Sequence, residues 1–274
     1  ERPNDEEQEA LTQLGIDYDL LVDALDPHEV PRVEHDDGWT YFITRLPDTD
    51  DDFNDYTTPI FFALGKQYIV TVSRDSLGRL WQPFIDNTQV STAQRTKIFM
   101  LMLEAITRQY QTRVASINRQ MRATTSDVRT LTSKDIITLT EYERKLNDYL
   151  DALQPTNTAV EKLLAGKLLP LYEDDRDLVE DVSIEFEQLI ARCKSLLRTI
   201  TNVRDSYRAV MDTRLNETIR LLTVITLAFT APTMIAGLYG MNVEIPGEHL
   251  PYMFWIVVIF SLVVSGGLGI YFLR

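Results

Sequence analysis

Cysteine is almost absent from this 274-residue chain, in which Cys193 is the one thiol. A single thiol excludes an intrachain disulfide and fits a reducing compartment. The sequence also has no glycine-rich phosphate loop, no zinc-hydrolase helix motif, and no serine or cysteine nucleophile with a plausible base. We therefore expect that the protein is not an enzyme.

Charge is absent from two stretches near the C-terminus, residues 221–243 and 250–273. Each is long enough to cross the roughly 30 Å hydrocarbon layer as a helix. Buried core helices are usually shorter and interrupted by polar residues. Because both stretches lie far from the N-terminus, neither is a signal peptide. We therefore predict a membrane protein with two spans in contact with lipid.

Basic residues are scarce in residues 1–55, which hold 18 Asp and Glu but only 3 Arg. The rest of the chain is nearly balanced, so the net charge of −14 comes from this N-terminal fifth. Such an acidic region repels nucleic acid and anionic lipid, and it attracts cations. We expect cations as partners and no nucleic acid.

Lys and Arg are also missing from the connector LYGMNVEIPGEHLPY, residues 238–252, between the two apolar stretches. Arg214 and Arg220 precede the first stretch, and Arg274 follows the second. By the positive-inside rule both ends face the cytoplasm and the connector lies outside, as in a multi-pass protein of the plasma membrane. Because the chain begins at Glu1 rather than at Met, we also expect a trimmed form that lacks a basic tail.

Strand and helix signals divide the remaining sequence. Residues 39–46 and 59–72 are rich in aromatic and β-branched types and predict strands, the second broken near Gly65 into a hairpin. Neither glycine nor proline occurs in residues 171–231. We therefore predict one helix from about residue 174 to 239, roughly 100 Å long at 1.5 Å per residue.

The predicted fold class is α+β: a cytoplasmic domain joined by a very long stalk helix to an all-α hairpin of two spans. Amphipathic spacing predicts further helices at 16–25, 92–121 and 133–153. The expected segments are an acidic N-terminal α/β cytoplasmic domain (1–90), a cytoplasmic helical region (91–170), the stalk helix (171–220), a pore-lining first transmembrane helix (221–240), an extracellular loop (241–251) and a second transmembrane helix (252–274).

The long helix carries an apolar seam with alternating spacings of four and three. Its residues are Val182, Phe186, Leu189, Cys193, Leu196, Ile200, Val203, Tyr207 and Val210. Such a heptad repeat packs along other helices over several turns, so we expect Cys193 to be a packing residue. We also expect the seam to hold subunits together below the membrane.

A polar stripe follows one face of the first span. It consists of Thr223, Thr226, Thr230 and Thr233, and Asn216 and Asp205 continue it down the helix. Each threonine hydroxyl can instead simply bond back to a backbone carbonyl. Four threonines in register nevertheless favour a helix that lines a wet path. Since two spans cannot enclose a pore, several chains must surround it as a closed cyclic oligomer.

The segment YGMN (239–242), at the outer end of the first span, resembles the signature of the CorA family of divalent-cation channels. The resemblance extends to RLNETIRLLTVIT (214–226), IAG (235–237) and LLVDALDPHEVPRVEHDDGWTYFITRL (20–46). The tripeptide GMN alone is a weak signal, but its position on a C-terminal hairpin of two spans makes it specific. The resemblance covers nearly the whole chain.

This resemblance implies a homopentamer with a cytoplasmic funnel, in which first spans line the pore and second spans form an outer ring. It assigns the selectivity motif to Gly240, Met241 and Asn242, with the Asn242 amides forming a ring at the outer mouth. It places a polar ring at Asn216, a hydrophobic gate at Ile219 and Leu222, and a pore-facing line at Thr226, Thr230 and Thr233. Neutral amides suit Mg²⁺, because they accept hydrogen bonds from the hydrated ion without binding it too tightly for release.

The resemblance further implies that intracellular Mg²⁺ binds between subunits. Asp23 and Asp205 match the carboxylate pair that bridges neighbouring protomers through the ion, and Asp181 matches a member of a second site. That second site is weakened or absent, because positions where acids are expected hold Val22, Arg108 and Gln109. We expect bound Mg²⁺ to hold the funnel closed and its loss to bias the pore open.

Two departures from the family pattern leave the ion preference open. Pro232 stands one position later than the usual proline, and IPGE (245–248) replaces a Met-Pro-Glu loop. The outer-loop acids Glu244 and Glu248 either concentrate cations at the mouth or only keep the loop soluble.

Mg²⁺ is the expected ion, both as cargo and as regulator. A first alternative is a Zn²⁺, Co²⁺ or Ni²⁺ transporter on the same fold. Its available imidazole ligands are His28, His35 and His249, but no two of them share a short metal-type spacing. A second alternative is a membrane-anchored coiled-coil sensor or scaffold, in which the polar stripe and Asn242 would be incidental.

Overall fold

The computed structural model describes residues 2–49, 55–78, 81, 95–166, 168–169, 173–242, 247 and 250–273. The chain forms two compact units, which we call unit 1 (Glu1–Arg204) and unit 2 (Asp205–Arg274). Unit 1 contains the whole β-sheet, and unit 2 contains the two most apolar helical stretches.

The sheet of unit 1 is an antiparallel meander of four strands in the order β1-β2-β3-β4. Its strands are β1 (Arg32–Asp36), β2 (Trp39–Thr49), β3 (Asp55–Leu64) and β4 (Ile69–Ser73). The predicted strands and the break near Gly65 are confirmed. The sequence did not predict β1, because within RVEHD only Val33 is buried and no alternation of apolar residues is visible.

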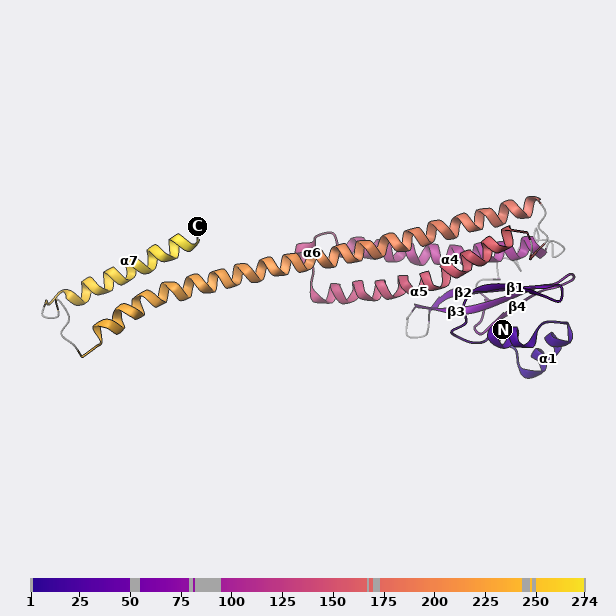
Figure 1. Ribbon diagram of the computed structural model, residues 1–274, viewed down its shortest axis with the longest axis horizontal. Helices are drawn as coiled ribbons and strands as arrows, with labels where there is room; N and C mark the ends of the chain where they lie inside the picture. Colours follow the sequence, from indigo (N-terminus) through magenta and orange to yellow (C-terminus); the bar gives the residue numbers. More distant parts are fainter. Residues whose placement is uncertain are drawn as a thin grey trace. The chain divides into compact units, whose positions relative to one another are not determined.

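Both faces of the sheet are buried, which explains the nearly continuous apolar runs of β2 and β3. Because side chains alternate along a strand, Phe42 and Phe62 point to one face while Tyr41 and Phe61 point to the other. The second face packs against α2 (Tyr18–Asp23), which Asp17 caps through two backbone N–H groups. Figure 1 shows the strands between α1 (Asp5–Gln13) and the long helices α4 (Arg95–Thr124) and α5 (Ser133–Leu164).

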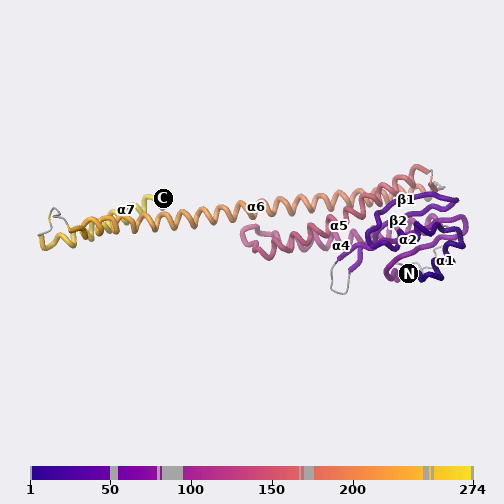
Figure 2. The backbone as a smooth tube through the Cα atoms, turned by 60° about the horizontal axis from the view of Figure 1, so that its bottom comes forward, coloured from indigo at the N-terminus to yellow at the C-terminus, as the bar shows by residue number. Residues whose placement is uncertain are grey.

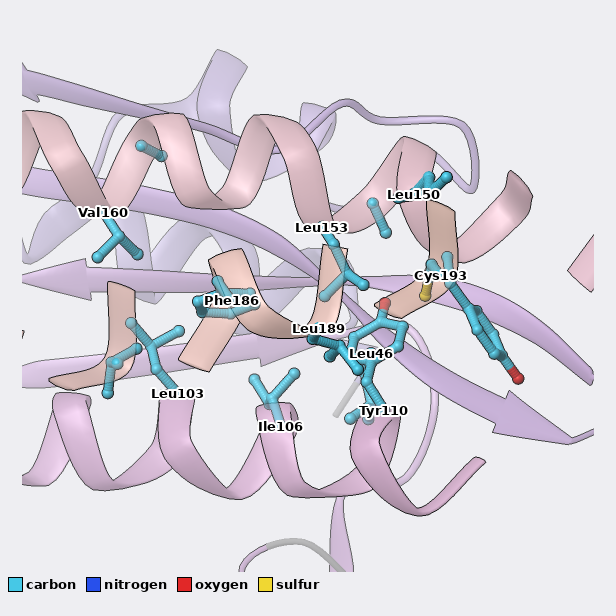
Figure 3. Packing of buried hydrophobic residues seen from close by; sticks show 14 of the residues in the cluster. Leu46, Leu103, Ile106, Tyr110, Leu150, Leu153, Val160, Phe186, Leu189 and Cys193 are labelled. Atoms are coloured by element: carbon cyan, nitrogen blue, oxygen red, sulfur yellow. The ribbon is translucent and has the colours of Figure 1, made fainter. Parts of the chain in front are cut away.

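The opposite face of the sheet is covered by α4 and α5. The first part of α6 (Glu173–Tyr239) packs against these two helices and completes the core. The helices predicted for these regions are confirmed over the described residues, and α5 continues through Pro155. Figure 3 shows α6 residues Phe186, Leu189 and Cys193 packed among Leu103, Ile106 and Tyr110 of α4 and Leu150, Leu153 and Val160 of α5.

The apolar seam of α6 packs against helices of the same chain. Six seam residues, Val182, Phe186, Leu189, Cys193, Leu196 and Ile200, are only 0–6% exposed. The expectation that the seam holds subunits together is therefore wrong for this part, because its own α4 and α5 already cover it. The packing role of Cys193 is confirmed, and burial raises the pKa of its thiol to about 12.

Unit 2 is a helical hairpin. In it α6 continues to Tyr239, and α7 (Met253–Leu273) runs back beside it, as Figure 1 and Figure 2 show. Each helix carries a stretch that is long and apolar enough to cross a membrane, in agreement with the two predicted spans. One polar contact between them is the hydrogen bond from Arg220 Nη2 to the carbonyl of Phe272, at 2.9 Å.

A second polar contact is linked to the proline inside α6. Pro232 has no N–H, so the carbonyl of Ala228, four residues earlier, loses its helical donor. The hydroxyl of Ser265 on α7 donates to that carbonyl at 2.5 Å. Since an unsatisfied carbonyl is costly in lipid, this contact both satisfies the acceptor and fixes the position of α7 along α6.

Candidate functional site

The predicted selectivity motif lies where α6 ends. The N–H of Gly240 still donates to the carbonyl of Ala236 at 3.0 Å, and the N–H of Met241 donates to that of Leu238 at 3.4 Å. A Cβ at Gly240 would lie 3.3 Å from the Ala236 oxygen, so glycine serves a close backbone approach here. Asn242 follows directly and is exposed.

The outer-loop acids predicted at Glu244 and Glu248 lie outside the described residues. Gly247 between them is described and has a φ of +90°, the left-handed region that favours glycine. The carbonyl of Gly247 accepts the N–H of Leu250 at 3.0 Å, which forms the turn that leads into α7.

The threonine stripe is exposed along α6. Each hydroxyl donates to the carbonyl four residues earlier, at 2.7–2.8 Å, for Thr223, Thr226, Thr230 and Thr233. This backbone bonding is the alternative to a pore-lining role that the sequence leaves open. It leaves the stripe intact, however, because a hydroxyl oxygen that donates one hydrogen bond can still accept others.

The stripe faces away from α7. Thr226 and Thr230, with Thr233 and three apolar neighbours, line an open groove of about 590 Å³. The side of α6 next to α7 is marked by Ala228, which bonds to Ser265, and by Val224, which is 6% exposed. Thr226 differs from each of these by two positions, roughly 200° around the helix. One face of α6 is thus covered by α7, and the opposite face is open and carries the threonines among apolar side chains.

The residues predicted for the inner end of the path lie on the same open side. Asn216, Ile219 and Leu222 follow each other at spacings of three. Asn216 is exposed, and Ile219 and Leu222 are 51% and 63% exposed. Both large apolar side chains are thus at least half exposed among the described residues, and their role as a gate stays a prediction.

The first predicted regulatory carboxylate, Asp23, is the last residue of α2. Its Oδ2 lies 2.8 Å from Nη2 of Arg32, and its side chain is 47% exposed. Its predicted partner, Asp205, belongs to unit 2, where it is 64% exposed and lies 3.6 Å from Nη1 of Arg208. The bridging of the two carboxylates between protomers stays a prediction.

Asp181, the predicted member of a second metal site, shares an open pocket of about 320 Å³ with Glu104 and Glu185. The pKa of Glu185 is raised by burial and by the charges of Glu104 and Asp181, while Arg108 opposes this. The resemblance predicted an acid at the position of Arg108 or Gln109, whereas the acid that α4 contributes is Glu104, one helical turn earlier. The spacing of four between Glu104 and Arg108 could have indicated this, because it allows the ion pair that the two side chains form.

The histidines considered for a softer metal are not gathered in the described parts of the chain. His35 Nδ1 lies 3.0 Å from Thr40 Oγ1, and the backbone N–H of His28 donates to Asp26 at 2.9 Å. His249 lies outside the described residues. Within those residues, no group of three or more His, Cys, Asp or Glu side chains could hold a metal ion in the single chain.

Known proteins resemble this chain along its whole length. The cobalt/magnesium transport protein CorA of Methanocaldococcus jannaschii is 26% identical over 270 residues, which cover 96% of this chain and 84% of that protein. The complete structure of the CorA magnesium transporter from the same organism superposes with a TM-score of 0.86 at 22% identity, covering 100% of this chain and 88% of that one. That likeness confirms the predicted fold of a small sheet domain, a long helix and a C-terminal apolar helix.

A zinc transporter is also similar, over a shorter region. The zinc transport protein ZntB of Pectobacterium carotovorum is 22% identical over 108 residues, which cover 39% of this chain and 33% of that protein.

The family described as CorA-like Mg²⁺ transporter protein matches residues 1–274. This chain therefore belongs to the family of CorA-like Mg²⁺ transporter proteins.

Proposed function

We propose that this protein passes Mg²⁺ across the plasma membrane through a homopentameric pore lined by α6. Both termini face the cytoplasm, and the segment from Asn242 to α7 faces outside. The hydrated ion is selected at a ring of Asn242 amides. Intracellular Mg²⁺, bound between the cytoplasmic parts of neighbouring subunits, controls opening.

The observation that carries this proposal is the two-sided surface of α6 in unit 2. Ser265 of α7 contacts Ala228 on one side, while Thr226 and Thr230 line an open groove on the other. A single hairpin in lipid would gain nothing from a polar face turned away from its partner helix. Around a central axis, the same face of several α6 helices lines a path, and α7 forms the outer ring.

Asn242 is suited to select the ion. It lies in the turn directly after α6, so a ring of its amides would stand at the end of the threonine-lined path. Its carbonyl oxygen accepts hydrogen bonds and carries no charge. Such a group can hold the waters of a hydrated Mg²⁺ ion while still releasing it.

Exposed apolar side chains support an assembly of several copies. In unit 2, Leu222 is 63% exposed on the polar side of α6, where lipid would not reach it in a closed ring. In unit 1, Tyr18 and Val22 are 53% and 45% exposed on α2, next to Asp23. A subunit contact at this face would cover them and bring another chain to the Asp23 carboxylate.

Regulation follows from carboxylates that repel each other without a metal. Asp23 of one subunit and Asp205 of the next would share a Mg²⁺ ion, because Mg²⁺ prefers carboxylate and water oxygens. Asp181, with Glu104 and Glu185 nearby, would contribute a weaker second site. Bound ions hold the subunits together and the pore closed, and their loss shifts the population towards open states.

Transport is tested by uptake into liposomes that contain the purified protein. We expect Mg²⁺ to enter, and Asn242→Ala to slow entry by about tenfold or more, since a ring loses one hydrogen-bonding group of about 1 kcal/mol in every subunit. Asn147→Ala, which removes an exposed amide from α5, is the matched control. If no divalent ion crosses the membrane, a scaffold or sensor explains the protein better.

The same uptake assay decides between ions. Co²⁺, Ni²⁺ and Zn²⁺ are the alternative cargoes, favoured by the cobalt named for the M. jannaschii relative and the zinc named for ZntB. We expect Mg²⁺ to be preferred at equal concentration. Faster entry of Zn²⁺ than of Mg²⁺ would reassign the cargo.

The regulatory pair is tested by measuring uptake at several internal Mg²⁺ concentrations. We expect Asp23→Ala combined with Asp205→Ala to remain open at concentrations that close the wild-type protein. If the double variant kept the wild-type sensitivity to internal Mg²⁺, these two carboxylates would not be part of the sensor.

A further inference from the structure

Positive charge is scarce in the N-terminal region, and among the described residues Arg32 forms an ion pair with Asp23. Arg32, at the start of β1, contacts three carboxylates: Asp23 at the end of α2, Glu29 in the connection and Glu34 on β1. The Asp23 contact, between Nη2 and Oδ2, is 2.8 Å long. The three carboxylates sit in the most acidic part of the chain, where residues 1–55 contain only 3 arginines.

The guanidinium of Arg32 is held in this position by its surroundings. Arg45 donates to the backbone carbonyls of Pro27 and Glu29, both at 2.8 Å, and thereby fastens the connection between α2 and β1 to the sheet. The side chain of Glu29 is only 13% exposed, whereas that of Asp23 is 47% exposed. Arg32 is thus anchored on its buried side and presents its charge to a carboxylate that remains accessible.

We propose that Arg32 is a built-in counter-ion that competes with Mg²⁺ for the Asp23 carboxylate and thereby sets the internal Mg²⁺ concentration at which the channel closes. This inference rests on the proposed function, in which Asp23 binds the regulatory ion. Without metal, Arg32 is the counter-ion that Asp23 shares with Glu29 and Glu34. When Mg²⁺ bridges Asp23 to the next subunit, Arg32 keeps its contacts with Glu29 and Glu34, so the exchange leaves no charge unpaired.

The direction of the effect distinguishes competition from simple structural support. If Arg32 competes, its removal frees Asp23 and makes Mg²⁺ bind more tightly. If Arg32 only stabilises the fold, its removal loosens the site and Mg²⁺ binds no better. Because exposed ion pairs are weak, we expect a fall of about two- to fivefold in the half-maximal Mg²⁺ concentration.

The experiment uses the full chain, purified and assembled, with Mg²⁺ alone as the probe. The thermal unfolding midpoint is measured against Mg²⁺ concentration, because a bound ion stabilises the folded assembly. Arg32→Gln is compared with wild type and with Arg122→Gln, which removes an equal charge from an exposed site in the last turn of α4. Inhibition of uptake by internal Mg²⁺ gives a second readout.

We expect Arg32→Gln to respond at two- to fivefold lower Mg²⁺ than wild type, and Arg122→Gln to match wild type. In an Asp23→Asn background, Arg32→Gln should cause no further shift, because the competing carboxylate is gone. An unchanged or weaker Mg²⁺ response of Arg32→Gln, beside a normal wild-type response, would overturn the inference and leave the proposed regulation standing.

Two further outcomes are also decisive. If the wild-type protein itself shows no Mg²⁺ response, the proposed regulation fails and the role of Arg32 fails with it. If Arg32→Gln does not assemble, Arg32→Lys is used, because lysine keeps the charge but cannot reach three carboxylates with one planar fork. A lower half-maximal concentration in Arg32→Lys supports competition, and an equal one overturns it.

Discussion

Two phenylalanines of α6, one in each unit, differ strongly in how far their side chains are exposed. Phe186 in unit 1 is 1% exposed, packed between α4 and α5. Phe229 in unit 2 is 71% exposed. The same helix is therefore covered by its own chain around Phe186 and left uncovered by it around Phe229.

This contrast explains why the sequence signals of the two regions differ. In unit 1 apolar residues recur at spacings of three and four, because only one side of α6 meets the core. In unit 2 apolar residues surround the helix, and the pattern is carried instead by the threonines. In unit 1, the apolar residues indicate which side of α6 is buried. In unit 2, where most residues are apolar, the polar residues distinguish one side of the helix from the others.

The largest expected effect tests the contrast directly. Phe186→Ala should lower the free energy of unfolding of unit 1 by about 3–5 kcal/mol, because it opens a cavity in a packed core. Phe229→Ala should change the free energy of unfolding of the protein by less than about 0.5 kcal/mol. Urea denaturation in detergent, followed by circular dichroism, measures both. Equal losses would mean that Phe229 is as well packed as Phe186.

The next effect concerns charge inside unit 1. Asp55 lies 2.7 Å from Arg113 and 2.9 Å from Lys145. Burial alone would raise the pKa of Asp55, but Lys145, Thr49 and Arg113 outweigh it and hold the pKa below its ordinary value. The folded pKa is lower than the unfolded pKa, so this stabilisation is complete above the unfolded value, about 3.9, and is lost as the pH falls through the folded pKa.

Asp55→Asn should therefore destabilise unit 1 at neutral pH, by about 1.5–3 kcal/mol for lost charged hydrogen bonds. It should also flatten the acid-induced loss of stability below about pH 4. Urea denaturation at a series of pH values measures both effects. A variant that keeps the wild-type pH profile would show that another carboxylate causes the acid dependence.

A smaller effect is expected for the contact between the two spans. Ser265→Ala removes the donor to the Ala228 carbonyl and should destabilise the hairpin by about 0.6–1.7 kcal/mol. In a Pro232→Ala background the same substitution should cost less, because residue 232 regains an N–H for that carbonyl. A double-mutant cycle on the stability of the detergent-solubilised protein measures the coupling. Additive losses of stability would show that Ser265 and Pro232 act independently.

The smallest expected effect is on the polar stripe. Thr230→Val keeps the shape of the side chain and removes its hydroxyl, so Mg²⁺ uptake should fall by only a few-fold while stability changes little. Thr218→Val, which also removes a hydroxyl bonded to the preceding turn, is the control outside the stripe. Equal effects of the two variants on uptake would argue against a path along the threonine face.

Much of this architecture was predictable because its signals are local and repeated. The absence of glycine and proline predicted α6 within one residue at its start, and β2 to β4 followed from aromatic and β-branched runs. Strand β1 and helix α1 were not predicted, because β1 buries only Val33 and α1 buries no residue. Helix α1 is instead marked by its Asn4–Glu7 capping box.

The site was less predictable than the fold, since its contacts join distant segments. The common face of the threonines follows from helical periodicity, but the side of α6 that meets α7 depends on Ser265, 37 residues from its partner Ala228. The contact between Arg32 and Asp23 likewise needs α2 and β1 to be placed side by side. The resemblance to the family identified the Asp23 carboxylate but did not predict the guanidinium of Arg32 beside it.

The bond between Ser265 and Ala228 also constrains how this sequence can vary. Moving the proline of α6 by one position would free a neighbouring carbonyl, turned by roughly 100° around the helix axis. The hydroxyl at position 265 would then face an acceptor that is already bonded. We therefore expect the place of the proline in one span and of the hydroxyl in the other to change together in evolution, as a covarying pair of positions.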